Sequence, residues 1–202
     1  MIGAINDTRR SHIVTIEDPI EYVFHDNYSV IEQREVGSDT MSFVAALKYI
    51  LRQDPNVIMV GEMRDYETIS AAITLAETGH LVLATLHTYN AVQTIDRIID
   101  TFPPHQQTQV KSQLSMLLAA VISQRLIPRI SGGRIAVREI LVRNAAVANL
   151  IREHKTAQLK SVMEMHSKEG MITLDMHLKE LYKAGEITKE TAQAYLEDPA
   201  LI

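Results

Sequence analysis

Residues 56–66 read Asn-Val-Ile-Met-Val-Gly-Glu-Met-Arg-Asp-Tyr, an apolar run that ends at a carboxylate. The run 57–60 lies between Pro55 and Gly61, which is typical of a short strand buried on both faces of a sheet. Glu62 follows the carboxyl end of this strand, where ligands bind in open α/β sheets. The stretch therefore has the form of a Walker B element, whose acidic residue serves the magnesium of a bound nucleotide. A carboxylate that merely caps the next helix is the alternative interpretation.

A second strand is predicted upstream, at residues 12–16, and it runs into Glu-Asp-Pro-Ile-Glu at residues 17–21. Three carboxylates within five residues repel one another unless solvent or a cation neutralises them. Such a cluster at a strand end fits a site that faces a metal ion and a water molecule to be activated. A solvated acidic turn interrupted by Pro19 is the alternative.

A third apolar run, at residues 81–84, predicts a buried strand that two histidines bracket. His80 precedes the run and His87 follows it. His87 is therefore expected at the same edge of the sheet as Glu62 and Glu21. For each histidine, a hydrogen-bonded structural residue is the alternative to a phosphate contact.

Together, residues 16–22, 51–65 and 78–88 resemble the Asp box, Walker B and His box of the secretion ATPase superfamily. Its members are hexameric motors of type IV pili and type II secretion. The resemblance covers residues 1 to about 200 and implies an α/β fold, a RecA-like P-loop NTPase core with a parallel sheet flanked by helices. We expect this core, incomplete at its N-terminus, in residues 1–143 and a C-terminal helical region in residues 144–202.

The C-terminal part is similar to the pilus-retraction branch of this superfamily. Residues 170–181 resemble its helical region, and residues 145–153 resemble its signature Ala-Ile-Arg-Asn-Leu-Ile-Arg-Glu, with departures at Val147 and Ala148. Ala148 removes an arginine charge that the signature carries, and an ordinary amphipathic helix is the alternative interpretation of this segment. Extension and secretion motors typically carry a tetracysteine zinc motif, which a chain without cysteine cannot form. The resemblance thus implies ATP hydrolysis that drives pilus retraction in twitching motility.

A phosphate cradle of the form Gly-x-x-x-x-Gly-Lys-[Ser/Thr] does not occur in the sequence, because none of the eight glycines precedes Lys-Ser or Lys-Thr. Residues 1–10 resemble the helix that follows this cradle, so we expect the chain to begin just after it and to lack the family's PAS-like domain. We predict that the chain alone does not hydrolyse ATP at a motor-like rate. We also expect unpaired edges on the buried strands. A non-catalytic truncated subunit, which assembles with or inhibits intact motors, is the alternative function.

The resemblance also implies roles for individual residues. Glu21 would activate or position the attacking water, Glu62 would act on Mg²⁺ through water, and His87 would sense the terminal phosphate. His80 would link the His box to a neighbouring subunit. Arginines act between subunits in such motors, and Arg64 could equally pair with Glu62 or Asp65. The additional nucleotide-site candidates are Glu17, Asp18, His80 and Arg64, and the arginine candidates are Arg9, Arg34, Arg52 and Arg64.

The resemblance implies ATP and Mg²⁺ as cofactors, a homo-hexamer, and a platform protein of the inner membrane as partner. We expect a cytoplasmic location at the base of the pilus machine, with only peripheral contact with the membrane machinery. The net charge of −5 and the absence of a Lys/Arg-rich run argue against nucleic-acid binding. The start has no signal peptide, and the apolar stretch 116–122 is too short to span a bilayer. A metal-dependent hydrolase is a further alternative, but no His-x-x-x-His spacing supports it.

Periodicity and capping residues predict the remaining elements. Thr40 or Ser42 can cap a helix that extends to about residue 52, and Asp65 can cap a helix to about residue 77. Asn90 precedes another helix. We further expect one long helix over residues 105–122, two short strands around residues 131–133, and helices from residue 145 onward with interruptions at 167–170 and 184–185.

Overall fold

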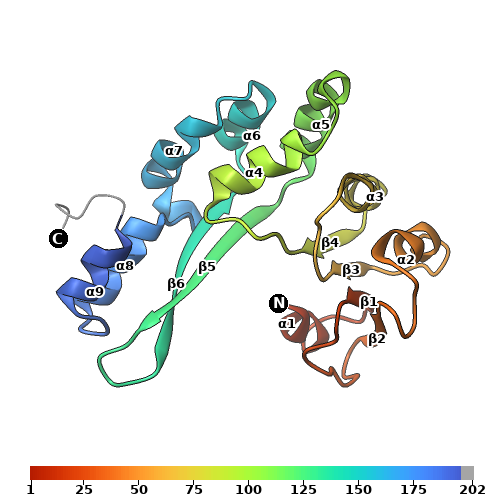
Figure 1. Cartoon of the computed structure of the whole chain (residues 1–202), viewed down its shortest axis with the longest axis horizontal. Helices are drawn as coiled ribbons and strands as arrows, with labels where there is room; N and C mark the ends of the chain where they lie inside the picture. Colours follow the sequence, from red (N-terminus) through yellow and green to blue (C-terminus); the bar gives the residue numbers. More distant parts are fainter. Residues whose placement is uncertain (197–202) are drawn as a thin grey trace. The chain divides into compact units, whose positions relative to one another are not determined.

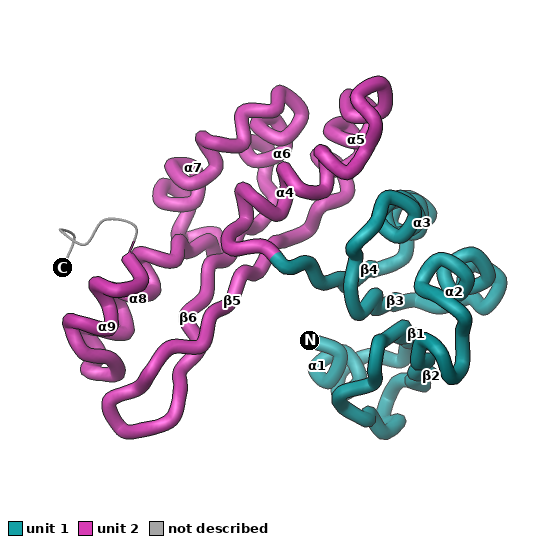
Figure 2. The backbone as a smooth tube through the Cα atoms, viewed as in Figure 1, with its two compact units in different colours: residues 1–87 teal, residues 88–202 magenta. Residues whose placement is uncertain are grey.

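A computed structural model gives the fold of the chain and describes residues 1–196. The chain divides into two compact units, one formed by residues 1–87 and one that begins at Thr88 (Figure 2). The boundary that we predict from the sequence, after residue 143, lies within the second unit and stays a prediction about functional domains.

The first unit is built on a four-stranded parallel sheet with the strand order β2-β1-β3-β4 (Figure 1). The register pairs Ile16 with Val60 and Val60 with Ala84, so the carboxyl ends of β1, β3 and β4 lie at one edge. The two central strands lie in the core, because isoleucines of both are fully buried, and α2 and α3 add buried side chains such as Leu47 and Leu75. The strands are β1 (His12–Glu17), β2 (Val30–Glu35), β3 (Val57–Val60) and β4 (Leu81–Ala84).

Three helices accompany this sheet: α1 (Ile2–Asn6), α2 (Phe43–Ile50) and α3 (Tyr66–Glu77). The predicted caps are confirmed. Ser42 Oγ accepts a hydrogen bond from the Ala45 N–H at 3.1 Å, and Asp65 Oδ1 accepts one from the Thr68 N–H at 2.8 Å. Such side-chain acceptors satisfy the free N–H groups of the first helical turn and fix where each helix begins. Asp65, three residues beyond Glu62, thereby fixes the start of α3 at Tyr66.

One expectation about the strands is wrong and another holds in part. The sequence predicts that β4 is buried, but Leu81 is 39% exposed, and β4 pairs with β3 alone in the described part of the chain. The unpaired edge expected of the buried strands is found on β4, whereas the Walker B strand β3 pairs with β1 on one side and β4 on the other. Within residues 1–196, the unpaired edges of this sheet belong to β2 and β4.

The second unit combines a long antiparallel hairpin with helices. The predicted helix over residues 105–122 is wrong in its second half, because α5 ends at Leu117 and Ile122 lies in strand β5, opposite Ile140. The strands expected to be short have nine residues each. The elements are α4 (Ala91–Asp100), α5 (Pro104–Leu117), β5 (Ala120–Pro128), β6 (Arg134–Val142), α6 (Ala145–Arg152), α7 (Leu159–Met165), α8 (Leu174–Lys183) and α9 (Lys189–Tyr195), with short 3₁₀ turns at Thr156–Gln158 and Ser167–Glu169.

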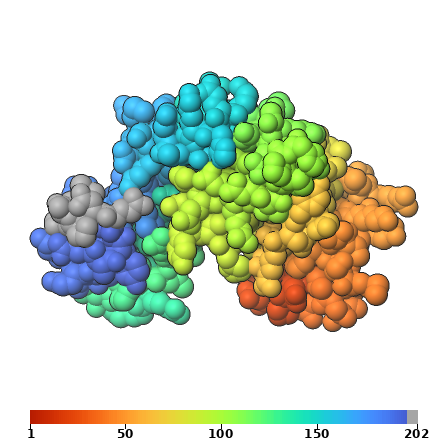
Figure 3. Space-filling model, turned by 45° about the horizontal axis from the view of Figure 1, so that its top comes forward, coloured from red at the N-terminus to blue at the C-terminus, as the bar shows by residue number. Residues whose placement is uncertain are grey.

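The C-terminal helices cover one face of this hairpin. Ile127 of β5 and Val137 of β6 form a buried cluster with Leu178 of α8 and Ala192 of α9. The signature-like segment is helix α6, and Ala148 lies on its buried face at 4% exposure. Helices α5 (green) and α6 (cyan) lie side by side on the surface of this unit (Figure 3). Among the described residues, no helix combines the length and apolar character that crossing a membrane requires.

Candidate functional site

The carboxyl edge of the first sheet is held together by hydrogen bonds between its loops. The Gly61 N–H donates to the Ile16 carbonyl oxygen at 2.7 Å, and the Met63 N–H donates to the Thr85 carbonyl oxygen at 3.0 Å. The Thr85 hydroxyl donates in turn to the Gly61 carbonyl oxygen. The chain segments that follow β1, β3 and β4 are therefore fixed to one another on either side of Glu62.

Gly61 occupies the narrowest position of this edge. A Cβ atom at this residue would lie 2.9 Å from the Ile16 carbonyl oxygen and 3.2 Å from the Glu17 Cα, both of them backbone atoms. Backbone atoms in a paired sheet cannot move aside as the end of a flexible side chain can. The close approach of β1 and β3 therefore requires glycine before Glu62.

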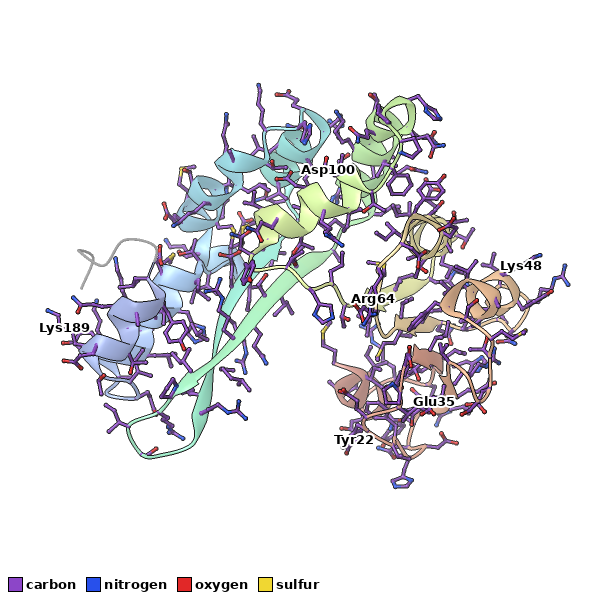
Figure 4. All side chains as sticks on the ribbon, viewed as in Figure 1. Tyr22, Glu35, Lys48, Arg64, Asp100 and Lys189 are labelled. Atoms are coloured by element: carbon purple, nitrogen blue, oxygen red, sulfur yellow. The ribbon has the colours of Figure 1, made fainter. Side chains whose placement is uncertain are left out.

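The carboxylate of Glu62 lies between two exposed basic side chains, those of Arg64 and His87. Its Oε1 accepts a hydrogen bond from Arg64 Nε at 2.5 Å and lies 3.0 Å from His87 Nε2. The Glu62 side chain is only 18% exposed, whereas those of Arg64 and His87 are 77% and 82% exposed. Figure 4 labels Arg64 at the carboxyl ends of β3 and β4. The predicted meeting of Glu62 and His87 at one edge is confirmed, and Arg64 is the ion-pair partner of Glu62.

These contacts alter the acidity of the pair. Hydrogen bonding to Arg64 lowers the pKa of Glu62, and the charge of His87 lowers it further. The pKa of Arg64 is raised, mainly by Glu62 and more weakly by the charge of Asp18. Glu62 is therefore an anion at neutral pH, which is the form that can hold a cation or its hydrating water.

The lowered pKa predicts a titration that depends on Arg64. The folded pKa lies below the ordinary value of 4.5, so the interaction stabilises the fold above pH 4.5 and is lost as the pH falls through the folded pKa. In an NMR titration of carboxyl ¹³C signals, the Glu62 midpoint should lie below 4.5 and move towards it in Arg64→Ala. Arg129→Ala, which removes a similar contact to Glu186 in the second unit, serves as the matched control. An unchanged Glu62 midpoint in Arg64→Ala would contradict the assignment.

The predicted acidic box separates into residues with different surroundings. Glu17 is 7% exposed, and its Oε1 accepts hydrogen bonds from Thr15 Oγ1 at 2.7 Å and Gln33 Nε2 at 2.9 Å. Asp18 is exposed and close enough to Arg64 to influence its pKa. Glu17 is thus bound by protein donors, whereas Asp18 belongs to the charged surroundings of Glu62.

Glu21 makes no hydrogen bond or ion pair with the cluster of Glu62, Arg64 and His87 among the described residues. It is exposed and lies in the irregular segment between β1 and β2. The structure therefore does not bring Glu21 into contact with the other predicted catalytic residues. Its role in water activation stays a prediction.

His80 is placed at the amino end of β4, at the opposite end of that strand from His87. Its Nδ1 lies 3.0 Å from the Leu75 carbonyl oxygen and 3.0 Å from Thr78 Oγ1, at the last turn of α3. This is a helix-capping arrangement, the structural alternative that the sequence left open. The predicted link to a neighbouring subunit is not tested by this contact.

The side chains around Glu62 suit Mg²⁺, which keeps water among its ligands, better than a metal ion whose ligands all come from the protein. Among residues 1–196, no group of three or more His, Asp or Glu side chains is arranged to hold a metal ion. Mg²⁺ is commonly bound through one or two carboxylates, water and substrate phosphates. Both contacts of Glu62 engage Oε1, and no recorded hydrogen bond within the described residues engages Oε2. Oε2 could therefore accept from a water molecule in the coordination shell of the ion.

Comparison with protein families gives a match over residues 1–132 to the family described as type II/IV secretion system protein. The chain is 50% identical over 199 residues to the type IV pilus retractation ATPase PilT of Pseudomonas aeruginosa, covering 98% of this chain and 58% of that protein. It is 52% identical over 194 residues to the twitching motility protein of Neisseria gonorrhoeae, covering 96% of this chain and 52% of that protein.

A solved structure, described as the pilus retraction motor PilT with bound ADP, is similar to the whole chain. It has a TM-score of 0.92 and 52% sequence identity, and the match covers 100% of this chain and 57% of that one. The predicted fold class is thereby confirmed. The chain spans a little over half the length of these two curated relatives.

Proposed function

Since this chain belongs to the type II/IV secretion system protein family, we propose that it forms the magnesium- and phosphate-facing part of an ATP-hydrolysing motor of type IV pilus retraction. The contact between Glu62 and His87, at the carboxyl edge of a parallel sheet, carries this proposal. It places an anionic carboxylate and an exposed imidazole side by side where α/β sheets bind ligands. The relatives named for pilus retraction and twitching motility support the choice of process.

Each residue of the cluster has a role that follows from its surroundings. Glu62 is ionised, and its free Oε2 would accept from water bound to Mg²⁺, which would neutralise charge on the transferred phosphoryl group. His87 is exposed, and among residues 1–196 its side chain is held through Glu62 alone, so its ring can turn to a terminal phosphate oxygen. Glu21, in the neighbouring segment, would position the attacking water.

Arg64 neutralises Glu62 in the absence of other cations. Its side chain is 77% exposed, so it can leave the carboxylate when the ion is bound. An arginine released in this way could stabilise transition-state charge, within its own subunit or in the next. The other arginine candidates, Arg9, Arg34 and Arg52, remain predictions.

The proposed assembly is a homo-hexamer at the cytoplasmic base of the pilus machine, with ATP and Mg²⁺ as cofactors and an inner-membrane platform protein as partner. This part of the proposal is carried by the family resemblance and the names of the relatives. His80 would contribute to subunit contacts through its Nε2, since its Nδ1 is engaged by α3.

A second candidate function is a non-catalytic subunit that assembles with intact motors. Motors of this kind hold the phosphates with the lysine and backbone N–H groups of a Gly-x-x-x-x-Gly-Lys-[Ser/Thr] stretch, which does not occur in these 202 residues. Adding the chain to the intact Pseudomonas aeruginosa relative distinguishes the two. If the chain is a non-catalytic subunit that inhibits intact motors, the rate of ATP hydrolysis by the mixture should fall as more of the chain is added.

A hybrid protein tests the proposed function directly. Residues of this chain would replace the 199 matching residues of the Pseudomonas aeruginosa relative, and the rest of that protein would supply the phosphate cradle that the family resemblance implies. We expect ATP hydrolysis by the hybrid within about tenfold of the intact relative, and no motor-like hydrolysis by the chain alone, because phosphate charge then lacks its compensating lysine. Hydrolysis by the purified chain would contradict the second expectation, and an inactive, folded hybrid would contradict the proposed function.

A further inference from the structure

The segment that carries Glu21 has an unusual architecture. Residues 18–29 connect two neighbouring parallel strands, β1 and β2, without a helix. Parallel neighbours are usually joined through a crossover helix, which supplies its own backbone hydrogen bonds. In residues 18–24, the recorded backbone hydrogen bonds go to side chains instead, and those side chains come from β2.

Glu35 holds the residue before Glu21. Its Oε2 accepts a hydrogen bond from the Ile20 N–H at 3.0 Å. Its other oxygen, Oε1, accepts one from Ser38 Oγ at 3.3 Å, so both carboxylate oxygens are engaged. Glu35 thus fixes the backbone immediately before Glu21.

Gln33 holds the residue after Glu21. Its Nε2 donates to the Tyr22 carbonyl oxygen at 2.9 Å and to Glu17 Oε1 at 2.9 Å. Its Oε1 accepts from the Phe24 N–H at 2.8 Å. One side-chain amide thereby joins the end of β1 to two points of the segment, and it does so from a partly buried position. Figure 4 labels Tyr22 and Glu35, which belong to the two sides of this network.

We propose that Gln33 and Glu35 are positioning residues that fix where Glu21 presents its carboxylate to the attacking water. The inference rests on the proposed function, because Glu21 has a water to position only if the chain serves a nucleotide site. Glu21 itself is exposed, so the placement of its carboxylate depends on the backbone on either side. Glu35 fixes that backbone at Ile20 and Gln33 fixes it at Tyr22.

Side chains of β2 point alternately to its two faces, so Gln33 and Glu35 lie on a different face from their neighbours Glu32 and Arg34. Gln33 and Glu35 are two positions apart, so they lie on the same face of the strand. Glu32 and Arg34 lie on the other face, where they pair with each other. Glu32 is therefore a matched control, a glutamate of the same strand that does not touch the segment.

The kinetic test uses the hybrid protein. A misplacement of a reacting group by about 1 Å can cost about 100-fold in rate. We expect Glu35→Ala and Gln33→Ala to lower kcat by about 10- to 100-fold with less than a threefold change in KM for ATP. Glu35→Gln should restore most of kcat, because its amide oxygen can still accept from the Ile20 N–H. Glu32→Gln, which removes the charge but keeps an oxygen that can accept from Arg34, should leave kcat within twofold of the unsubstituted hybrid.

Hydrogen exchange on the 202-residue chain tests the geometry without activity. The Ile20 and Phe24 amides should exchange faster in Glu35→Ala and Gln33→Ala respectively, while the Ile58 amide of the central strand keeps its protection and reports that the fold is intact. Unchanged exchange at both sites would overturn the proposal. An active hybrid in which both alanine variants keep kcat within twofold would overturn it as well, and would leave the proposed function standing. A hybrid without activity would instead contradict the proposed function, and the positioning role with it.

Discussion

Glu62→Gln is expected to lower kcat for ATP hydrolysis by at least about 100-fold in the hybrid protein. Glutamine keeps the size of the side chain and an oxygen that accepts from Arg64, but it removes the negative charge that serves Mg²⁺ and its bound water. A 100-fold loss corresponds to about 2.7 kcal/mol of transition-state stabilisation. Steady-state hydrolysis at saturating ATP measures it.

The matched control is Glu67→Gln, which removes a glutamate charge from the exposed first turn of α3. This variant should hydrolyse ATP within twofold of the unsubstituted hybrid. Since Glu62 lies at the sheet edge and not in the core, both variants should unfold at similar denaturant concentrations. A Glu62→Gln hybrid with normal kcat would show that this carboxylate does not serve the reaction.

Gly61→Ala is expected to lower the free energy of unfolding of the first unit by about 2–3 kcal/mol, the upper range for overpacking at a tight site. The added methyl group would lie 2.9 Å from the Ile16 carbonyl oxygen, an atom that also accepts the Gly61 N–H at 2.7 Å. Relief of that clash requires β1 and β3 to separate at the edge where Glu62 is placed. Urea denaturation of the 202-residue chain measures the loss.

Gly3→Ala provides the control for this substitution. A Cβ atom at Gly3 meets no atom within 4 Å, and Gly3 lies inside helix α1. The same added methyl group should therefore be neutral or raise the free energy of unfolding by up to about 1 kcal/mol. Equal stability of the Gly61→Ala and unsubstituted chains would contradict the close approach of β1 and β3.

Local signals in the sequence predicted the strands and caps of the first unit well. The run 57–60 matches β3 at both ends, because Pro55 and Gly61 interrupt regular structure on either side. Asp65 and Asn90 cap the helices that they precede, since capping depends on residues only three positions apart. The sequence predicts Glu62 and His87 at one edge, and Glu62 Oε1 lies 3.0 Å from His87 Nε2.

Features that depend on distant residues could not be predicted in this way. The exposure of β4 depends on which strands pair with it, and residues 81–84 carry no information on that pairing. Ile122 belongs to an apolar run that suits a helix or a strand, and its pairing with Ile140 decides for the strand. The surroundings of Glu17 depend on Gln33, sixteen positions away, so the acidic cluster did not show that Glu17 is bound by protein donors.

The central claim is that Glu62 and His87 face the terminal phosphates of a nucleotide, and histidine NMR tests it most directly. The hybrid would be labelled in its histidine rings and titrated with the magnesium complex of a non-hydrolysable ATP analogue. This chain has eight histidines, so the ring signals of the other seven serve as internal references for the signals of His87. A large shift of the His87 ring signals, with little change at His154 and His177 of the second unit, is the predicted result. Tight binding of the analogue with an unchanged His87 signal would contradict the claim.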